Sequence, residues 1–326
     1  MLAWNSVAAY RALLCNTRNV RNTRNTRNTR NTRNAADRPT PPSTQQESII
    51  TMFKPTRVDA FDHVKFRLTG PLSKKQIAKL KPHCHELTHE GVSIHCMPNS
   101  PYVLEVSQPH ATFFRVLRQE AGTDMGIEPA GAEVARDYTT RSRLEAKRML
   151  RYFLQTATLR HGPKKIKQFK STIYYGSRER NRRLALYADK PSKLSTSSKG
   201  MPCLHTEIRL KGTTALRDQG LGTLDEFDNF DFNGFWSRNL RFWDFGTRST
   251  LGKLLGKKKS ISDESARARV RRMFHSKHYL VADKFVLQKV LIRYPQIMNA
   301  LERINTKAWE RRARDAALEQ FVPGKL

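Results

Sequence analysis

Two short runs of alternating polar and apolar residues, 172–175 and 183–187, flank a Gly-Ser turn, and no other feature constrains the fold as strongly. Alternation with a period of two is typical of β-strands, and a Gly-Ser pair followed by charged residues is typical of a turn. The stretch therefore predicts an antiparallel hairpin. Because successive side chains point to opposite faces, Leu184 and Leu186 are expected in the core and Tyr187 on the other face.

Other segments predict further strands and one well-marked helix. The helix is expected after residue 140, because Ser142 precedes Glu145 by the capping-box spacing and apolar residues follow near one helical face. The strands are expected over 63–70, 100–107, 131–140 and 203–212. This mixture predicts an α+β fold with a largely antiparallel sheet and flanking helices.

The character of the sequence changes along the chain and predicts four parts. Residues 1–51 contain a repeat of Asn, Thr and Arg without an apolar face, so a disordered tail or leader is expected there. Residues 52–216 form the predicted α+β domain, and 217–250 form an aromatic-rich connector. Residues 251–326 are expected to form an all-helical C-terminal extension.

The repeat itself has three interpretations. It is a flexible arm that neutralises phosphates, a translated leader upstream of a start near Met52, or a mitochondrial transit peptide. We favour the leader, because nothing in the repeat specifies a contact.

The charge of the chain points to a polyanionic partner. The sequence has 60 Lys and Arg against 29 Asp and Glu, a net charge of +31 at pH 7. Such an excess favours nucleic acid first and an anionic membrane second. The sequence has neither a run of about 18 apolar residues nor a lipid-anchor motif, so we expect a soluble protein with no membrane partner. Its four cysteines are sparse and uneven, which fits a reducing compartment.

Acidic residues and a histidine on two predicted strands suggest a cation site. In 203–211, alternation separates Leu204, Ile208 and Leu210 from Cys203, His205, Glu207 and Arg209. The same rule turns Asp137 and Glu133 to one face of 131–140. If the polar faces coincide, Asp137 and Glu207, with His205 or Glu133, can hold Mg²⁺ or Mn²⁺. Alternatively, these acids only pair with the abundant arginines.

Tyr187 has two interpretations. A tyrosine on an open face, flanked by Arg182 and Arg183 and near a metal, can attack a phosphodiester, leaving a 5′-phosphotyrosine and a free 3′-hydroxyl. Its ordinary pKa of about 10 means that the metal or Lys190 must stabilise the developing charge. The other interpretation is a cross-strand aromatic residue in a basic nucleic-acid-binding sheet.

The order of these segments resembles a known family. STIYYGSRERNRRLALYADK, preceded by VARDYTTRS and followed by CLHTEIRLKGTTALRDQGL, is similar to the gene II-type replication initiators of filamentous phages, and more distantly to plasmid rolling-circle initiators, over about 130–222. The resemblance implies that Tyr187 is the nucleophile, with Lys190 beside it and Asp137 and Glu207 at the metal. Two departures stand out. Two residues separate Tyr187 from Lys190 where the family usually has one. His205 and Thr206 stand where Arg and an aromatic residue are usual, so His205 either acts as a ligand or simply replaces the Arg.

The resemblance also implies a function. It is that of a rolling-circle DNA replication initiator: a metal-dependent endonuclease that nicks one strand at the origin and later rejoins the ends. Arg182, Arg183 and Arg209 are then expected to contact DNA, Mg²⁺ or Mn²⁺ is the expected cofactor, and host replication proteins in a bacterial cytoplasm are the expected partners. A non-enzymatic basic nucleic-acid-binding protein, or a related transposase or relaxase, remains an alternative.

Three further segments have a functional and a structural interpretation. The histidines and cysteines of 83–96 form either a zinc site or exposed loop histidines, and the absence of a clean CxxC or HxxxH pair favours the loop. The aromatic residues of 227–245 stack unpaired bases or, as we favour, plug a domain junction. The basic helix at 265–280 either tracks DNA phosphates or is a solvated face.

Overall fold

The computed structural model describes most of the chain after residue 55. The described residues are 56–91, 101–160, 165–177, 180–194, 198–244, 251–252, 254–255, 262–274, 278–281 and 283–318. They all belong to the unit Thr51–Leu326, which is separate from the unit Met1–Ile50. The repeat and the predicted tail at 1–51 lie outside the described residues.

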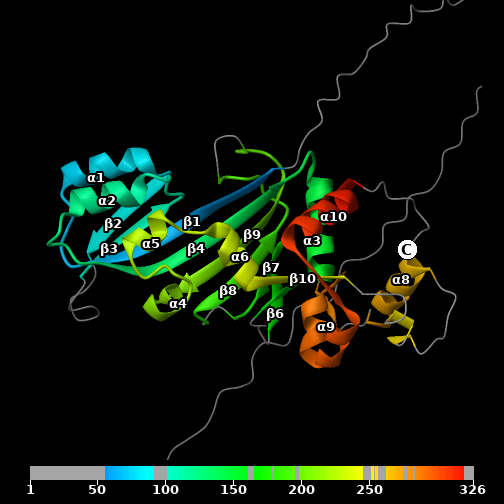
Figure 1. Cartoon of the computed structure of the whole chain (residues 1–326). Helices are drawn as coiled ribbons and strands as arrows, with labels where there is room; N and C mark the ends of the chain where they lie inside the picture. The colour runs from blue at the N-terminus through cyan, green and yellow to red at the C-terminus, as the bar shows by residue number, and fades with distance from the viewer. Residues whose placement is uncertain are drawn as a thin grey trace, which may run out of the picture. The chain divides into compact units, whose positions relative to one another are not determined.

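An eight-stranded sheet of antiparallel pairs organises the described part of the chain (Figure 1), in the order β2-β3-β1-β4-β9-β8-β7-β6. Its strands are β1 (Arg57–Leu68), β2 (Glu86–Gly91), β3 (Tyr102–Ser107), β4 (Ile127–Thr139), β6 (Ile166–Phe169), β7 (Thr172–Tyr175), β8 (Arg182–Tyr187) and β9 (Cys203–Lys211). The predicted α+β class with a large antiparallel sheet and flanking helices is confirmed.

Helices pack on one face of this sheet. Phe114 of α2 and Phe227 of α5 contact Phe61 and Phe66 of β1, and Trp309 of α10 contacts Tyr138 of β4. The helices are α1 (Lys74–Leu80), η1 (Lys81–His83), α2 (Phe113–Ala121), α3 (Arg143–Thr156), α4 (Thr213–Arg217), α5 (Leu224–Asp228), α6 (Phe232–Asn239), α8 (Asp263–Met273), α9 (Leu287–Arg293), η2 (Pro295–Ala300) and α10 (Thr306–Leu318). On β9, the side chains that alternate with the core residues, among them His205, Glu207 and Arg209, stand on the opposite face.

The hairpin predicted from alternation is present as β7 and β8, with Leu184 and Leu186 in the core. Gly176 begins the turn with a φ of +110°, and a Cβ there would lie 3.2 Å from the carbonyl oxygen of Arg182. Glycine alone meets both demands without strain. At the start of α3, Ser142 accepts a hydrogen bond from the amide of Glu145, so the predicted cap is also present.

The C-terminal part of the chain is not all-helical. Two short strands pair with each other, and a third joins β10 (Leu240–Asp244), which also pairs with β5 (Ala157–Leu159). The added strands are β11 (Leu280–Val281), β12 (Lys284–Phe285) and β13 (Glu302–Ile304). Strands of two or three residues are too short to leave a periodic signal, so the sequence did not reveal them. None of the helices in the described part has the length and apolar character needed to cross a lipid bilayer.

The aromatic residues after Thr223 fill the helical side of the core. Phe227, Phe235 and Trp236 are buried, and Phe230 and Phe232 pack against Phe61 of β1. The segment therefore belongs to the main hydrophobic core of the single unit Thr51–Leu326, and its described aromatic rings pack against protein side chains. Phe245 lies outside the described residues.

Trp236 also covers a buried ion pair. The guanidinium of Arg136, which is 1% exposed, lies 5.1 Å from the Trp236 ring centroid and donates to Asp59 at 2.6 and 3.2 Å. Removing one partner of such a pair leaves an uncompensated buried charge.

We expect Asp59→Ala to lower the free energy of unfolding by about 3–5 kcal/mol, because Arg136 then has no carboxylate partner. Urea denaturation followed by circular dichroism measures this loss. The matched control is Glu105→Ala, which removes the half-exposed partner of Lys65 at 2.6 Å and is expected to cost less than about 1 kcal/mol. Equal losses in the two variants would contradict a special contribution of the buried pair.

Candidate active site

Three neighbouring strands, β4, β9 and β8, bring the predicted site residues to the sheet face that the main helices leave free. His205 of β9 pairs with Asp137 of β4 and with Tyr187 of β8. Two residues further along β9, Glu207 pairs with Ala135 of β4 and Ala185 of β8. The apolar side chains Leu204, Ile208 and Leu210 of β9 are buried on the other face, as alternation predicts.

Tyr187 lies directly on His205. The two rings are stacked, with centroids 4.4 Å apart and planes inclined by 22°. The Lys190 ammonium lies 5.6 Å from the Tyr187 ring centroid, on the segment that follows β8. Burial and the negative charges of Glu207, Asp62 and Asp137 raise the pKa of Tyr187 well above its ordinary value. The phenol therefore stays protonated at neutral pH unless positive charge is added nearby.

His205 is held by a carboxylate at each ring nitrogen. Its Nδ1 lies 2.6 Å from Asp137 Oδ1 and its Nε2 lies 3.3 Å from Glu207 Oε2. Burial alone would lower the pKa of His205, but these hydrogen bonds and charges outweigh it and raise the pKa to about 10. Asp137 is fully buried behind the ring. It thus fixes the orientation of His205 from one side, while Nε2 faces the acids on the other.

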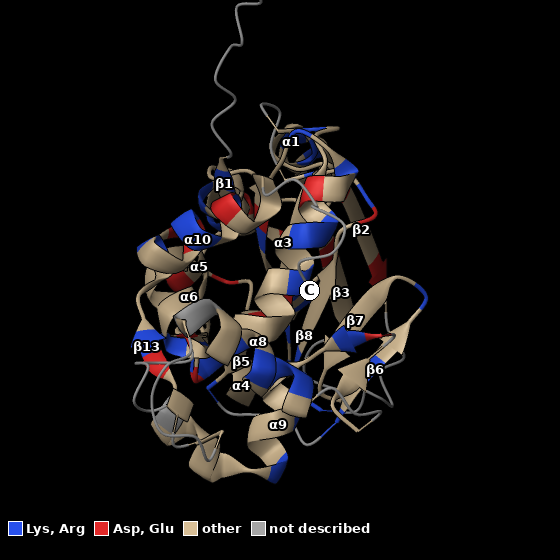
Figure 2. Cartoon of the chain, turned by 90° about the vertical axis from the view of Figure 1, so that its right-hand side faces the viewer, with Lys and Arg blue, Asp and Glu red and all other residues tan. Residues whose placement is uncertain are grey.

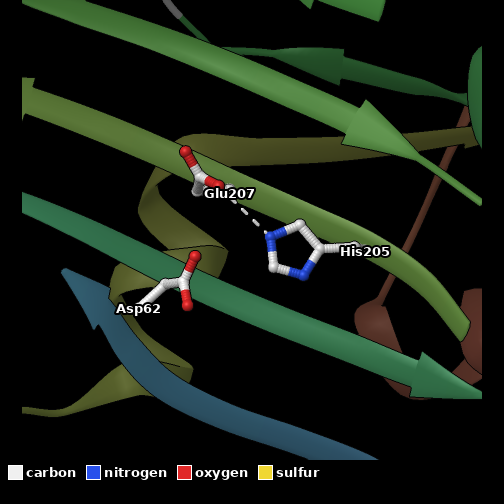
Figure 3. Close-up of side chains that lie close together, drawn as sticks. All are labelled: Asp62, His205 and Glu207. Carbon is white, nitrogen blue, oxygen red and sulfur yellow. Dashed lines mark hydrogen bonds and ion pairs between the residues drawn. The ribbon is translucent and has the colours of Figure 1, made fainter. Parts of the chain in front are cut away.

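A third acid reaches this place from β1. Asp62 stands at a register irregularity. Phe61 pairs with Val134 and His63 pairs with the adjacent Glu133, so Asp62 is the extra residue of a β-bulge. The bulge turns its carboxylate toward the site face, and Figure 3 shows it directed at His205 and Glu207 from across β4. Asp62 is a site residue that the sequence analysis missed.

Asp62, His205 and Glu207 lie close together, and we call them the three-residue group. Each offers a ligand atom, and the three atoms lie within 4.8 Å of one another. Within the described residues, this is the one set of three His, Cys, Asp or Glu side chains close enough to share a metal ion. Two carboxylates and an imidazole suit a divalent cation that accepts oxygen and nitrogen ligands, such as Mg²⁺ or Mn²⁺.

Arg209 balances the acids at the far end of the site. It contacts Glu207 and lies 3.3 Å from Glu133 Oε1. Burial and the charge of Glu207 raise the pKa of Glu133 to about 7, although Arg209 opposes this shift. Burial would raise the pKa of Glu207, but His205 and Arg209 hold it below its ordinary value. Glu207 is therefore ionised at neutral pH.

The arginines predicted to contact DNA are placed differently from one another. Arg183 lies on the site face, with its guanidinium 4.3 Å from the Tyr174 ring centroid. Arg182 points to the helical side, where its Nη2 donates to Gln219 at 3.4 Å. The structure therefore brings Arg183 and Arg209 to the face of Tyr187 but not Arg182.

The histidine-rich segment 83–96 forms no metal cluster in its described part. His83 contacts the Thr112 hydroxyl at 2.8 Å, Cys84 is buried, and the His89 ring stacks on Tyr102. Residues 86–91 of this segment form β2 instead of a loop, because they pair with β3 along the sheet edge. His95 and Cys96 lie outside the described residues.

Basic residues also occur away from the site. Figure 2 shows lysine and arginine on α8, on α10 and around the edge strand β6. On α8, which covers most of the predicted basic helix, Arg267 lies 3.3 Å from Asp244 and is thus ion-paired.

No protein-family model and no curated protein matches this chain. Among solved structures, the chain is similar to a rolling circle replication initiator protein from Geobacillus stearothermophilus. The sequences are 11% identical, the match covers 65% of this chain and 91% of that one, and the TM-score is 0.36. At this level the likeness has no bearing on the site or on its chemistry.

Proposed function

We propose that this protein is a metal-dependent DNA endonuclease and strand transferase with Tyr187 as the nucleophile, and that it initiates rolling-circle replication. One observation carries the proposal: the Tyr187 ring is stacked on His205, the central member of the three-residue group. A tyrosine placed against a cation site on a polar sheet face has the parts needed for phosphoryl transfer. The net charge of +31 fits a DNA substrate.

Asp62, His205 and Glu207 would hold the cation, with Asp137 orienting His205 through Nδ1. Because the pKa of His205 is raised to about 10 in the free site, its Nε2 would release a proton when the cation binds. The proposed ligand set differs from the one predicted from the sequence, in which Asp137 stood in the place of Asp62. When bound, Mg²⁺ or Mn²⁺ would polarise the scissile phosphate and offset the carboxylates that oppose ionisation of the phenol.

The chain's own residues then account for the transfer. The phenol of Tyr187 gives its proton to solvent, and its oxygen attacks phosphorus. The bond from phosphorus to the 3′-oxygen breaks, and that oxygen takes up a proton as the 3′-hydroxyl. The 5′ end stays on Tyr187 as a phosphodiester. To rejoin the strand, an incoming 3′-hydroxyl attacks this phosphorus and releases the phenol of Tyr187. Lys190, whose ammonium lies 5.6 Å from the Tyr187 ring centroid, would add positive charge close to the phenol.

The initiator assignment, beyond nuclease chemistry, is supported by the order of the segments. An Asp-bearing strand, a helix, a hairpin whose second strand carries Tyr187, and a strand with Glu207 follow one another as in the gene II-type initiators. We accordingly propose origin DNA and host replication proteins as partners.

Cleavage should depend on a divalent cation and should leave the protein attached to DNA. We expect origin-bearing supercoiled DNA, and a random-sequence single-stranded pool, to yield an adduct that survives denaturing gel electrophoresis in Mn²⁺ or Mg²⁺. A chelator should abolish the adduct, because without a cation nothing offsets the negative charge of the carboxylates that oppose ionisation of the Tyr187 phenol. DNA binding without cleavage would favour the non-enzymatic alternative, and cation-dependent cleavage without an adduct would exclude a tyrosine nucleophile.

A further inference from the structure

Phe169 is the most exposed of the large hydrophobic side chains that the structure describes. It stands at the end of the edge strand β6 and is 65% exposed. A single exposed aromatic residue is common on protein surfaces and by itself implies nothing. Its position relative to Tyr187, however, is specific.

The strand register places Phe169 in the same row as Tyr187. Phe169 pairs with Thr172 of β7, and Ile173, the next residue of β7, pairs with Leu186 of β8. Continuing this register by one residue sets Thr172 beside Tyr187, which pairs with His205. Directly paired residues share a face, so Phe169 lies on the site face. At about 4.8 Å per strand it stands roughly 10 Å from Tyr187, about three nucleotide steps of a stacked DNA strand.

The surroundings of Phe169 are basic. Lys167 is exposed on the same face of β6, and the Lys170 ammonium lies 5.8 Å from the Phe169 ring centroid. At the turn between β6 and β7, the acidic side chain among the described contacts is Asp189, which accepts a hydrogen bond from the Ser171 hydroxyl at 2.6 Å. This bond connects the turn between β6 and β7 to the segment that carries Lys190. The position of Phe169 is thereby coupled to the position of the Tyr187 site.

We propose that Phe169 is a stacking platform for an unpaired base of the substrate strand, close to the scissile phosphate, with Lys167 and Lys170 contacting the adjoining phosphates. Its location beside the scissile bond rests on the proposed function, whereas the binding itself does not. Exposed aromatic rings flanked by cations bind single strands in this way, because every unpaired base offers a π-face. In a duplex the bases are stacked on each other, so the platform selects single-stranded DNA.

The test is a binding measurement in chelator, so that no cleavage occurs. Fluorescence anisotropy with labelled oligodeoxythymidylate of about 20 nucleotides, and with a duplex of equal length, compares four proteins: wild type, Phe169→Ala, Phe169→Trp and Leu144→Ala. Leu144 is a matched control, since it is 57% exposed but lies on α3 in the helical layer. Unchanged thermal unfolding checks that the exposed substitutions leave the fold intact.

Phe169→Ala is expected to raise the Kd for the single strand about 5- to 150-fold. The duplex Kd should stay unchanged, Phe169→Trp should retain affinity, and Leu144→Ala should match wild type. Wild-type affinity of Phe169→Ala for the single strand, or equal losses for single strand and duplex, would overturn the proposal. Because no step of this assay requires cleavage, failure of Tyr187 as the nucleophile would leave the expected difference in place and is thus distinguishable.

Discussion

Tyr187→Phe is expected to lower the rate of adduct formation and of strand cleavage by at least about 1,000-fold, as the loss of other enzymatic nucleophiles does. The substitution removes only the phenol oxygen. The ring that stacks on His205 remains, so the fold and the three-residue group should be undisturbed. Quantitative gel analysis of cleavage in saturating Mn²⁺ gives the rate, and DNA affinity should change little.

The matched control is Tyr174→Phe. Tyr174 lies on the neighbouring strand β7 and on the same sheet face, under Arg183. It pairs with Ala185, two residues before the Tyr187 that pairs with His205. Its hydroxyl contributes at most a hydrogen bond to DNA, so cleavage should fall less than about tenfold. If Tyr174→Phe abolished the adduct while Tyr187→Phe retained it, the nucleophile would have been assigned to the wrong tyrosine.

Glu207→Gln is expected to weaken Mn²⁺ binding at least about tenfold and to lower cleavage at least about 100-fold. Glutamine has nearly the same size but lacks the negative charge that a divalent cation requires. Isothermal titration with Mn²⁺ alone measures the first effect independently of DNA. Asp62→Asn, at a half-buried position on another strand, should act in the same direction and guards against a folding defect at the buried Glu207.

Glu133→Gln is the control for this pair. Glu133 shares Arg209 with Glu207 but is not a member of the three-residue group. Its neutralisation should leave Mn²⁺ affinity within about a fewfold of wild type, since no ligand is lost. Wild-type Mn²⁺ binding by both Glu207→Gln and Asp62→Asn would mean that the three-residue group holds no cation. It would favour the alternative raised from the sequence, in which Glu207 only pairs with arginine.

Period-two alternation was sufficient to predict the faces of the central strands. It placed His205 and Glu207 opposite Ile208, and Tyr187 opposite Leu186, because both strands run without interruption through a sheet with one buried face. The pairing of Asp137 with His205 was not predictable in the same way. Which strands are neighbours depends on long-range packing. From the sequence, the metal site could therefore be predicted only on the condition that the polar faces of the two strands coincide.

Asp62 was missed because a bulge interrupts the alternation of β1. The core residues Phe61 and Val64 are three positions apart, and this break in the period of two was the available signal. The segment was predicted to start its strand at residue 63, after the bulge, so the break was not apparent. Strand boundaries are set by pairing partners, here β3 and β4, and partners are not visible in a single segment.

Mapping the attachment site of the DNA tests the central claim most directly. The adduct formed in Mn²⁺ would be trimmed with nuclease and digested with protease, and the modified peptide sequenced by mass spectrometry. The account predicts a nucleotide linked through its 5′-phosphate to Tyr187. A nucleotide on Tyr174, on Tyr175 or on any other residue, or cleaved DNA with no modified peptide, would contradict it.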